Sequence, residues 1–216
     1  MRTTITSPEL LALLQQMATD LIAQKDYLCE LDGAMGDGDQ GVTMAIGFKA
    51  IQTGLAALKD QDIGTILTKS GLAFNGTAAS TIGALLATAC LRAGKAVQGK
   101  PAIGVADLAA MTEAAAAGIQ ERGKAQVGDK TVLDALVPTV AALQTAAAQG
   151  TPLPTALAQA LAAAEAGVQA TIPLKAKVGR AAWIAERSVG HPDPGATSFY
   201  LMLKSAVEYL TALPPK

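Results

Sequence analysis

The chain has 216 residues, a length that suits one domain with a sizeable core, and we expect residues 1–216 to form that single domain. Half of the residues are hydrophobic but only 3% are aromatic, and alanine recurs in runs such as Ala114–Ala117. Alanine loses no side-chain entropy in a helix and lets helices approach closely, which favours packed helices over a sheet. A net charge of −1 without a run of lysine or arginine excludes a nucleic-acid-binding surface.

Helical patterns recur along the whole chain. Ser7 and Pro8 are typical of a helix start, with Ser7 as N-cap, and apolar residues then recur on one face as far as Ile22. The first five predicted helices cover about Ser7–Leu31, Val42–Leu58, Ile63–Ala73, Ala78–Val97 and Val105–Gly123. A sixth follows Asp129 and runs to about Ala148, a seventh is introduced by Thr151–Pro154 and runs to about Thr171, and an eighth covers Gly195 to about Leu213. A short helical piece is expected around Ala181 to Glu186, inside a long connector. Eight helices without a convincing strand predict an all-α domain.

Three aspartates lie in the loop after the first predicted helix, at Asp32, Asp37 and Asp39. Three carboxylates this close repel one another unless a cation joins them. Glycines between them let the backbone fold the carboxylates inward. A ligand set of oxygens without histidine or cysteine suits a hard ion, magnesium or calcium. The loop therefore predicts a metal site, the alternative being an acidic helix cap exposed to water.

Three familiar motifs match only in part. Gly36-x-Gly38-x-x-Gly41 has the spacing of the dinucleotide fingerprint, but a helix precedes it and aspartates occupy its variable positions. An EF-hand loop beginning at Asp37 would need glutamate where Phe48 stands. The glycines before Lys124 resemble a P-loop that lacks its serine or threonine. We reject all three interpretations.

Two later loops combine glycine with charge. In Arg122–Thr131, a helix end is followed by a helix that Asp129 or Thr131 is expected to cap, and capping alone explains this composition. The other loop includes Arg180, whose planar fork matches phosphate oxygens, and Pro194, which is suited to start a helix. His191, the one histidine, is expected to be a hydrogen-bonding loop residue rather than a catalyst.

Together these loops resemble the family of dihydroxyacetone kinase nucleotide-binding subunits, of the type that depends on the sugar phosphotransferase system. The likeness rests on Gly36–Gly41, Arg122–Ala125, Gly128–Thr131, Gly179–Arg180 and Gly190–Ala196, in the same order over nearly the whole chain. The resemblance implies a closed barrel of eight antiparallel helices with the nucleotide at one end. That number agrees with the eight helices predicted from the sequence pattern.

The resemblance also implies the site residues. Asp32, Asp37 and Asp39 would hold two Mg²⁺ ions that bridge the phosphates of ADP or ATP. The residues implied to bind nucleotide are Gln40, Gly41, Val42, Thr43, Ser80, Thr81, Ile82, Gly123, Val132, Arg180, Asp193, Pro194 and Gly195. Arg180 is also the expected catalytic residue. Two positions depart from the family: Gln40 replaces a histidine and cannot carry its charge, and Ile82 replaces a serine.

The partners implied are a subunit that holds dihydroxyacetone and a phosphohistidine protein that rephosphorylates bound ADP. Two alternatives stay open: an ATP-dependent kinase subunit for a related keto-sugar, and a non-catalytic nucleotide-binding regulator. A homodimer is compatible with the sequence. No signal peptide is visible before Leu10, and the apolar stretches are interrupted before they reach membrane-spanning length, which predicts a soluble cytoplasmic protein without a membrane partner.

Overall fold

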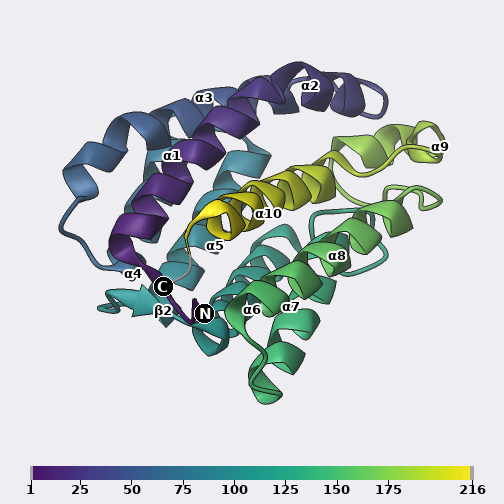
Figure 1. Ribbon diagram of the computed structural model, residues 1–216. Helices are drawn as coiled ribbons and strands as arrows, with labels where there is room; N and C mark the ends of the chain where they lie inside the picture. Colours follow the sequence, from purple (N-terminus) through teal and green to yellow (C-terminus); the bar gives the residue numbers. More distant parts are fainter. Residues whose placement is uncertain (1, 215–216) are drawn as a thin grey trace.

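The computed structural model describes residues 2–214, and most of these residues are helical (Figure 1). The α-helices of the described residues are α1 Ser7–Ala23, α2 Lys25–Gly33, α3 Gln40–Gly54, α4 Ile63–Thr77, α5 Thr81–Ala96, α6 Val105–Gly123, α7 Leu133–Ala148, α8 Leu153–Thr171, α9 Ala185–Ser188 and α10 Pro194–Ala212. Two short 3-10 helices are η1 Leu55–Leu58 and η2 Arg180–Ile184. The predicted all-α class is confirmed for this part of the chain.

Long helices that follow one another in the chain pack side by side. The contacts run from α1 to α3, and then through α4, α5, α6, α7 and α8 in turn. Helix α10 packs against both α8 and α1 (Figure 1). The helices enclose a core in which the rings of Phe48 and Phe74 meet edge to face, with their centroids 5.7 Å apart. The described ends of the chain meet, since the Arg2 guanidinium donates to the Pro214 carbonyl over 3.2 Å, whereas α2 and α9 lie at the far end of the molecule in Figure 1.

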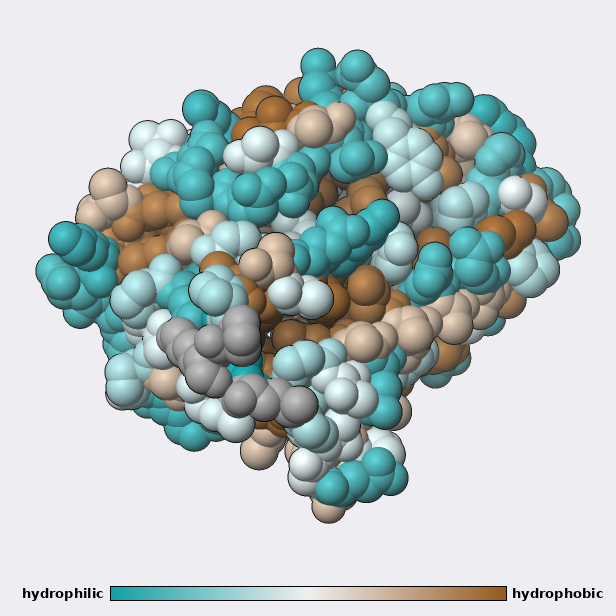
Figure 2. Space-filling view, viewed as in Figure 1, coloured by the Kyte–Doolittle hydropathy of each residue, from teal (hydrophilic) through white to brown (hydrophobic). Residues whose placement is uncertain are grey.

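The surface mixes polar and apolar residues. On the face shown in Figure 2, brown hydrophobic residues are visible between teal hydrophilic ones. The segment Gln40–Leu58, which comprises α3 and η1, is long and apolar enough to cross a membrane, judged by length and composition alone. This differs from the expectation that every apolar stretch is interrupted before it reaches that length. Met44, Phe48 and Ile51 on this segment are buried in the core. Packing within the bundle therefore accounts for its apolar composition.

The first predicted helix is wrong in extent, because the structure divides it at Gln24. Gln24 has ψ near 4°, and its N–H still donates to the Asp20 carbonyl over 3.1 Å. The break lets α2 pack on the start of α3, where a Cβ on Gly41 would lie 1.9 Å from the Lys25 carbonyl oxygen. Only glycine allows this approach, and it brings the end of α2 beside the start of α3.

Several predicted helix caps also differ. Thr6, rather than Ser7, is the N-cap of α1, and the Thr6 N–H donates to the Glu9 carboxylate over 2.9 Å. Helix α5 begins at Thr81 rather than Ala78, because the Ser80 hydroxyl accepts the Gly83 N–H over 3.1 Å. Asp129 does not cap α7: its carboxylate accepts the Gln126 N–H instead.

Two short strands also escaped prediction. β1 (Ile5–Thr6) and β2 (Ala102–Ile103) pair antiparallel, with Ile5 opposite Ile103. Each has only two residues, so no alternating pattern could reveal it.

Helices α4 and α5 cross closely where two glycines face each other. A Cβ on Gly94 would lie 2.6 Å from the Gly64 carbonyl oxygen, which is a backbone atom and cannot rotate away. Gly94→Ala is therefore expected to lower the free energy of unfolding by about 2 kcal/mol, the cost of overpacking. In a chain of this size, that loss lowers the melting temperature by about 4–8 °C.

Gly76→Ala is the matched control for that substitution, because Gly76 lies in α4 and a Cβ there would meet nothing within 4 Å. It is expected to leave stability unchanged or to raise it by up to about 1 kcal/mol, through helix propensity. Thermal unfolding followed by circular dichroism compares the two variants. Equal melting temperatures would contradict the close crossing of α4 and α5.

Candidate nucleotide and metal site

One cavity of about 260 Å³ gathers most of the residues that the sequence singled out. Its lining comes from the loop between α2 and α3, the start of α5, the connection from α6 to α7, and residues 178–181 and 193–195. The first residues of four helices lie in its wall: Gln40 of α3, Thr81 of α5, Leu133 of α7 and Pro194 of α10. Because free backbone N–H groups and a partial positive charge occur at helix N-termini, the cavity suits an anion.

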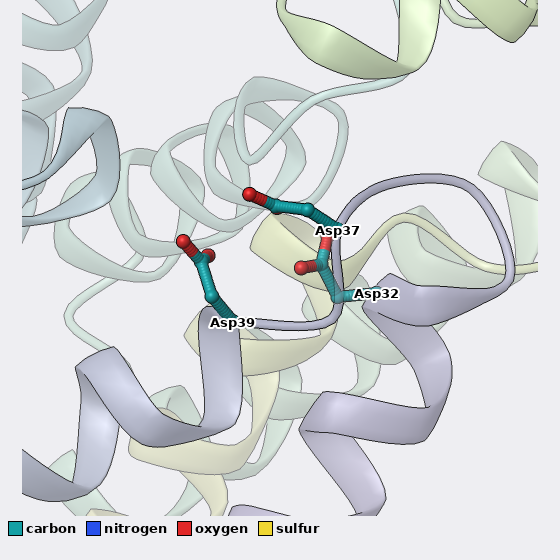
Figure 3. A group of neighbouring side chains, drawn as sticks. All are labelled: Asp32, Asp37 and Asp39. Carbon is teal, nitrogen blue, oxygen red and sulfur yellow. The ribbon is translucent and has the colours of Figure 1, made fainter.

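Asp32, Asp37 and Asp39 all line the cavity, and we call these neighbouring side chains the carboxylate trio (Figure 3). Each offers an oxygen, and these ligand atoms lie within 4.8 Å of one another. Asp32 belongs to α2, Asp39 directly precedes α3, and Asp37 lies in the loop between them. A Cβ on Gly36 would lie 2.6 Å from an Asp32 carboxylate oxygen and 3.1 Å from the Asp32 carbonyl oxygen, so any side chain at this position would crowd Asp32.

Arg180 lies at the carboxylate trio. Its guanidinium contacts the Asp37 carboxylate and lies 3.6 Å from the nearest Asp39 oxygen. Glu186, a nearby acidic residue of the same connector, pairs with Lys175 instead. The guanidinium therefore reaches across from residues 172–192 to the loop between α2 and α3.

Gln40 connects the starts of α3 and α10. Its side-chain amide donates to the Pro194 carbonyl over 2.6 Å and to the Ser198 hydroxyl over 2.7 Å. The Gln40 backbone N–H donates to an Asp32 carboxylate oxygen over 3.3 Å. The neutral side-chain amide thus links the starts of α3 and α10, and the backbone N–H of the same residue contacts one member of the carboxylate trio.

An apolar wall forms part of the cavity lining. It is made by Ile82, Leu85, Ile119, Ala125, Val132 and Leu133, with Gly123 beside them. Four of these side chains, those of Ile82, Leu85, Ile119 and Val132, also line an apolar cavity in the interior of the helix bundle. This apolar wall offers a flat ring a surface without hydrogen-bonding demands.

Asp193 caps α10 through its carboxylate, which accepts the Ala196 N–H over 2.7 Å. Burial, and to a smaller extent the nearby charge of Asp134, raises the pKa of this carboxyl group to about 7. The Ala196 N–H and the positive charge of Lys130 act in the opposite direction. Asp193 is therefore poised to change its charge near neutral pH.

This shift predicts a pH dependence of stability. The folded pKa of about 7 lies above the ordinary value of 3.8, so the folded state holds the proton more tightly and Asp193 lowers stability as the pH rises from about 4 to 7. Asp193→Asn keeps a cap but does not titrate. Its free energy of unfolding relative to wild type should rise across this interval and level off above it. Urea unfolding at several pH values measures the difference, and a constant difference would contradict the raised pKa.

Most predicted site residues lie around the one cavity. The members in its lining are Asp32, Asp37, Asp39, Gln40, Ser80, Thr81, Ile82, Gly123, Val132, Arg180, Asp193, Pro194 and Gly195. Gly41, Val42 and Thr43 do not line it: Gly41 is buried against α2, and Val42 is 41% exposed. The binding role of each residue stays a prediction.

Other lining residues were not predicted from the sequence. These include Met35, Gly36, Leu85, Ile119, Lys130, Thr131, Leu133 and Val178. Gly36, Lys130 and Thr131 stand inside motifs that were noted, whereas Leu85 and Ile119 are ordinary apolar positions of predicted helices. Only the fold shows that these helices meet at the cavity.

The comparison with known proteins identifies the class. The DAK2 domain family matches residues 34–208, which is most of the chain. The C. freundii dihydroxyacetone kinase in complex with AMP-PNP and Mg²⁺ superimposes with a TM-score of 0.70 at 26% identity, covering 92% of this chain and 33% of that one. This chain therefore belongs to the DAK2 domain family.

Two relatives narrow the assignment within that family. The ADP-binding subunit DhaL of the PEP-dependent dihydroxyacetone kinase of Escherichia coli (strain K12) is 39% identical over 181 residues, which cover 84% of this chain and 86% of that subunit. L-erythrulose 1-kinase of Mycolicibacterium smegmatis is 36% identical over 91% of this chain but 34% of its own length. The resemblance to the ADP-binding subunits of dihydroxyacetone kinases is thereby confirmed.

Proposed function

We propose that this chain is the nucleotide-binding subunit of a cytoplasmic dihydroxyacetone kinase. ADP bound with magnesium accepts a phosphoryl group from a phosphohistidine protein of the phosphotransferase system and passes it to dihydroxyacetone held by a separate subunit. The observation that carries the proposal is the single cavity that joins a carboxylate trio, a guanidinium and an apolar wall. The 39% identity to the E. coli subunit over most of both chains supports the same conclusion.

The donor set fits magnesium. The trio offers only carboxylate oxygens, close enough for one or two small ions to share them. When bound, magnesium supplies positive charge that offsets the charge of the phosphates. We propose two ions held by Asp32, Asp37 and Asp39.

The shape of the cavity suggests how a nucleotide lies in it. The phosphates would face the trio and the N-termini of α3 and α5, with Gln40 and Ser80 to Ile82 near them. The adenine would lie on the apolar wall beside Gly123 and Val132. The ribose would then face Asp193, Pro194 and Gly195. The eight longest helices are proposed to form a closed antiparallel barrel open at this end, and their ring of contacts supports this.

In this arrangement the residues of the chain position the phosphates and neutralise their charge. The guanidinium of Arg180 can donate two parallel hydrogen bonds to phosphoryl oxygens as charge spreads over them during transfer. Gln40 holds the starts of α3 and α10 together, so that their N–H groups face one ligand. Because the phosphoryl group moves directly between the nucleotide and its partners, no nucleophile of this chain is required.

One experiment separates the proposed function from the two alternative functions. If the chain serves an ATP-dependent keto-sugar kinase, a class supported by the L-erythrulose 1-kinase match, bound ADP exchanges readily with free ATP. If it is a non-catalytic regulator, nucleotide binds but no phosphoryl group moves. Gel filtration of the protein loaded with radiolabelled ADP and Mg²⁺, followed by incubation with the phosphorylated phosphohistidine protein, separates these cases. The proposal expects retained ADP that becomes ATP; rapid loss of ADP, or retention without phosphorylation, would refute it.

A further inference from the structure

Residues 172–192, which we name the lid segment, connect α8 to Asp193 at the start of α10 and carry Arg180. The segment contains only the short helices η2 and α9. Long helices hold their shape through regular internal hydrogen bonds, whereas a connector of this kind needs anchors from elsewhere to hold one position.

The main anchor is the side chain of Lys130. Its ammonium group donates to the carbonyl oxygens of Thr171 over 2.8 Å and Leu174 over 3.1 Å, where the lid segment begins. The same group donates to the carbonyl oxygens of Ser188 and His191, both over 2.6 Å, where the lid segment ends. One nitrogen atom thus joins the two ends of the segment.

The backbone of Lys130 is arranged for this contact. Lys130 has φ of 62°, in the left-handed region that side chains with a Cβ rarely adopt, and follows Gly128 with φ of 91°. Such a conformation is unfavourable for a residue with a Cβ and persists only where the surroundings maintain it. The residue is 2% exposed, so its charge has exchanged water for four carbonyl oxygens.

These contacts exclude a simpler role for Lys130. A lysine at a nucleotide cavity could serve as a phosphate ligand. Here the ammonium group has three hydrogens and four carbonyl acceptors already within 3.1 Å. Burial lowers the pKa of Lys130, while the charges of Asp193 and Asp134 favour the protonated form.

We propose that Lys130 is a positioning residue, which ties both ends of the lid segment to the start of α7 and thereby sets where Arg180 lies above the carboxylate trio. This inference rests on the proposed role of Arg180 in phosphoryl transfer. Ser188 assists from within the segment, since its hydroxyl accepts the Ala176 N–H over 2.9 Å and donates to the Ala185 carbonyl over 2.6 Å.

The first test reads the lid segment without any activity. Hydrogen–deuterium exchange followed by mass spectrometry compares wild type with Lys130→Met. The amides of 172–192 are expected to exchange about tenfold faster or more, while α1 and α4 keep their protection. Lys124→Met is the control, because Lys124 has a left-handed backbone too, with φ of 51°, but an exposed side chain; it should leave the exchange of 172–192 unchanged.

The second test links Lys130 to Arg180. In the kinase reconstituted with its partner subunits, Lys130→Met should lower kcat by about 10- to 100-fold, the effect of a misplaced catalytic group, with less change in KM. In the Arg180→Ala background, the same substitution should change kcat by less than about twofold, because the group that it positions is gone. If Lys130→Met does not fold, Lys130→Gln is used, because glutamine keeps two N–H donors. The faster exchange and the loss of kcat are then expected in the same direction but smaller.

Three results would overturn the inference: unchanged exchange in the lid segment, equally faster exchange in all helices, or an undiminished kcat loss in the Arg180→Ala background. A failure of the proposed function looks different. If Arg180→Ala itself leaves kcat unchanged, the role of Arg180 is wrong, while the exchange data still report whether Lys130 holds the lid segment.

Discussion

Asp37→Asn and Asp39→Asn are each expected to weaken the binding of ADP by about 100-fold at a fixed Mg²⁺ concentration, the effect of losing a ligand charge at a metal site. Asparagine keeps the shape of the side chain, so packing of the loop changes little. The substitution removes one of the negative charges that would hold the metal ion between ADP and the protein. Isothermal titration calorimetry with ADP measures the loss.

The control is Asp60→Asn, since Asp60 is exposed and lies in the turn between η1 and α4, outside the cavity lining. It should bind ADP as the wild type does. Addition of EDTA to the wild type should reproduce the loss seen in the variants. Wild-type affinity in both site variants, or an affinity indifferent to EDTA, would show that ADP does not bind through a metal at the carboxylate trio.

Arg180→Ala is expected to lower kcat of the reconstituted kinase by about 1000-fold, as for other residues that stabilise charge in a transferring phosphoryl group. Its affinity for ADP should change less than about fivefold, because its ion pairs are half-exposed and weak. Removing the guanidinium also frees Asp37 and Asp39 to bind a metal ion. Turnover and ADP binding are measured on the same protein preparation.

Arg180→Lys keeps the charge but loses the planar fork, so we expect it to restore only part of the turnover. The competing interpretation is that Arg180 is a structural link between the lid segment and the loop after α2. Under that interpretation, Arg180→Ala would loosen the cavity as a whole. Equal losses in kcat and in ADP affinity, with no rescue by lysine, would establish the structural role instead.

The carboxylate trio could be predicted from sequence because its geometry is local. Asp32, Asp37 and Asp39 fall within eight residues, and the glycines among them indicate a tightly folded loop. Helix periodicity likewise gave α6 and α8 nearly to the residue. The division of α1 from α2 was missed because it depends on contact with Gly41 of α3, which no pattern within the first 33 residues reveals.

Capping residues were harder to predict when several candidates stood together. In the connection from α6 to α7, Asp134 accepts the Gly128 N–H over 2.6 Å and the Thr131 N–H over 2.7 Å, although it lies inside α7. Asp129 and Thr131 were better candidates on spacing alone. In the structure the Thr131 hydroxyl accepts the Leu133 N–H over 3.2 Å, whereas the Asp129 carboxylate accepts the Gln126 N–H. The left-handed turn at Lys130 lies between these residues, and a side chain with a Cβ gives no sequence signal for that conformation.

The role of Lys130 could not be predicted at all, since its four acceptors are backbone carbonyls between 41 and 61 residues away. Any residue type supplies a carbonyl, so the sequence holds no trace of the contact. The residues predicted to bind nucleotide came instead from family resemblance. The resemblance selected Gln40 and Val132, which line the cavity. It also selected Val42 and Thr43, which lie outside its lining.

Reconstitution of the whole kinase tests most directly whether this chain relays the phosphoryl group to dihydroxyacetone. The chain is combined with the dihydroxyacetone-binding subunit, the phosphohistidine protein, its phosphotransferase-system donors and phosphoenolpyruvate, and dihydroxyacetone phosphate is measured over time. We expect dihydroxyacetone phosphate to form only when this chain is present and to stop forming when EDTA is added. The Asp39→Asn variant should not substitute for the wild-type chain. Equal formation without this chain, or none when every component is present and each partner is active with a known relative, would contradict the account.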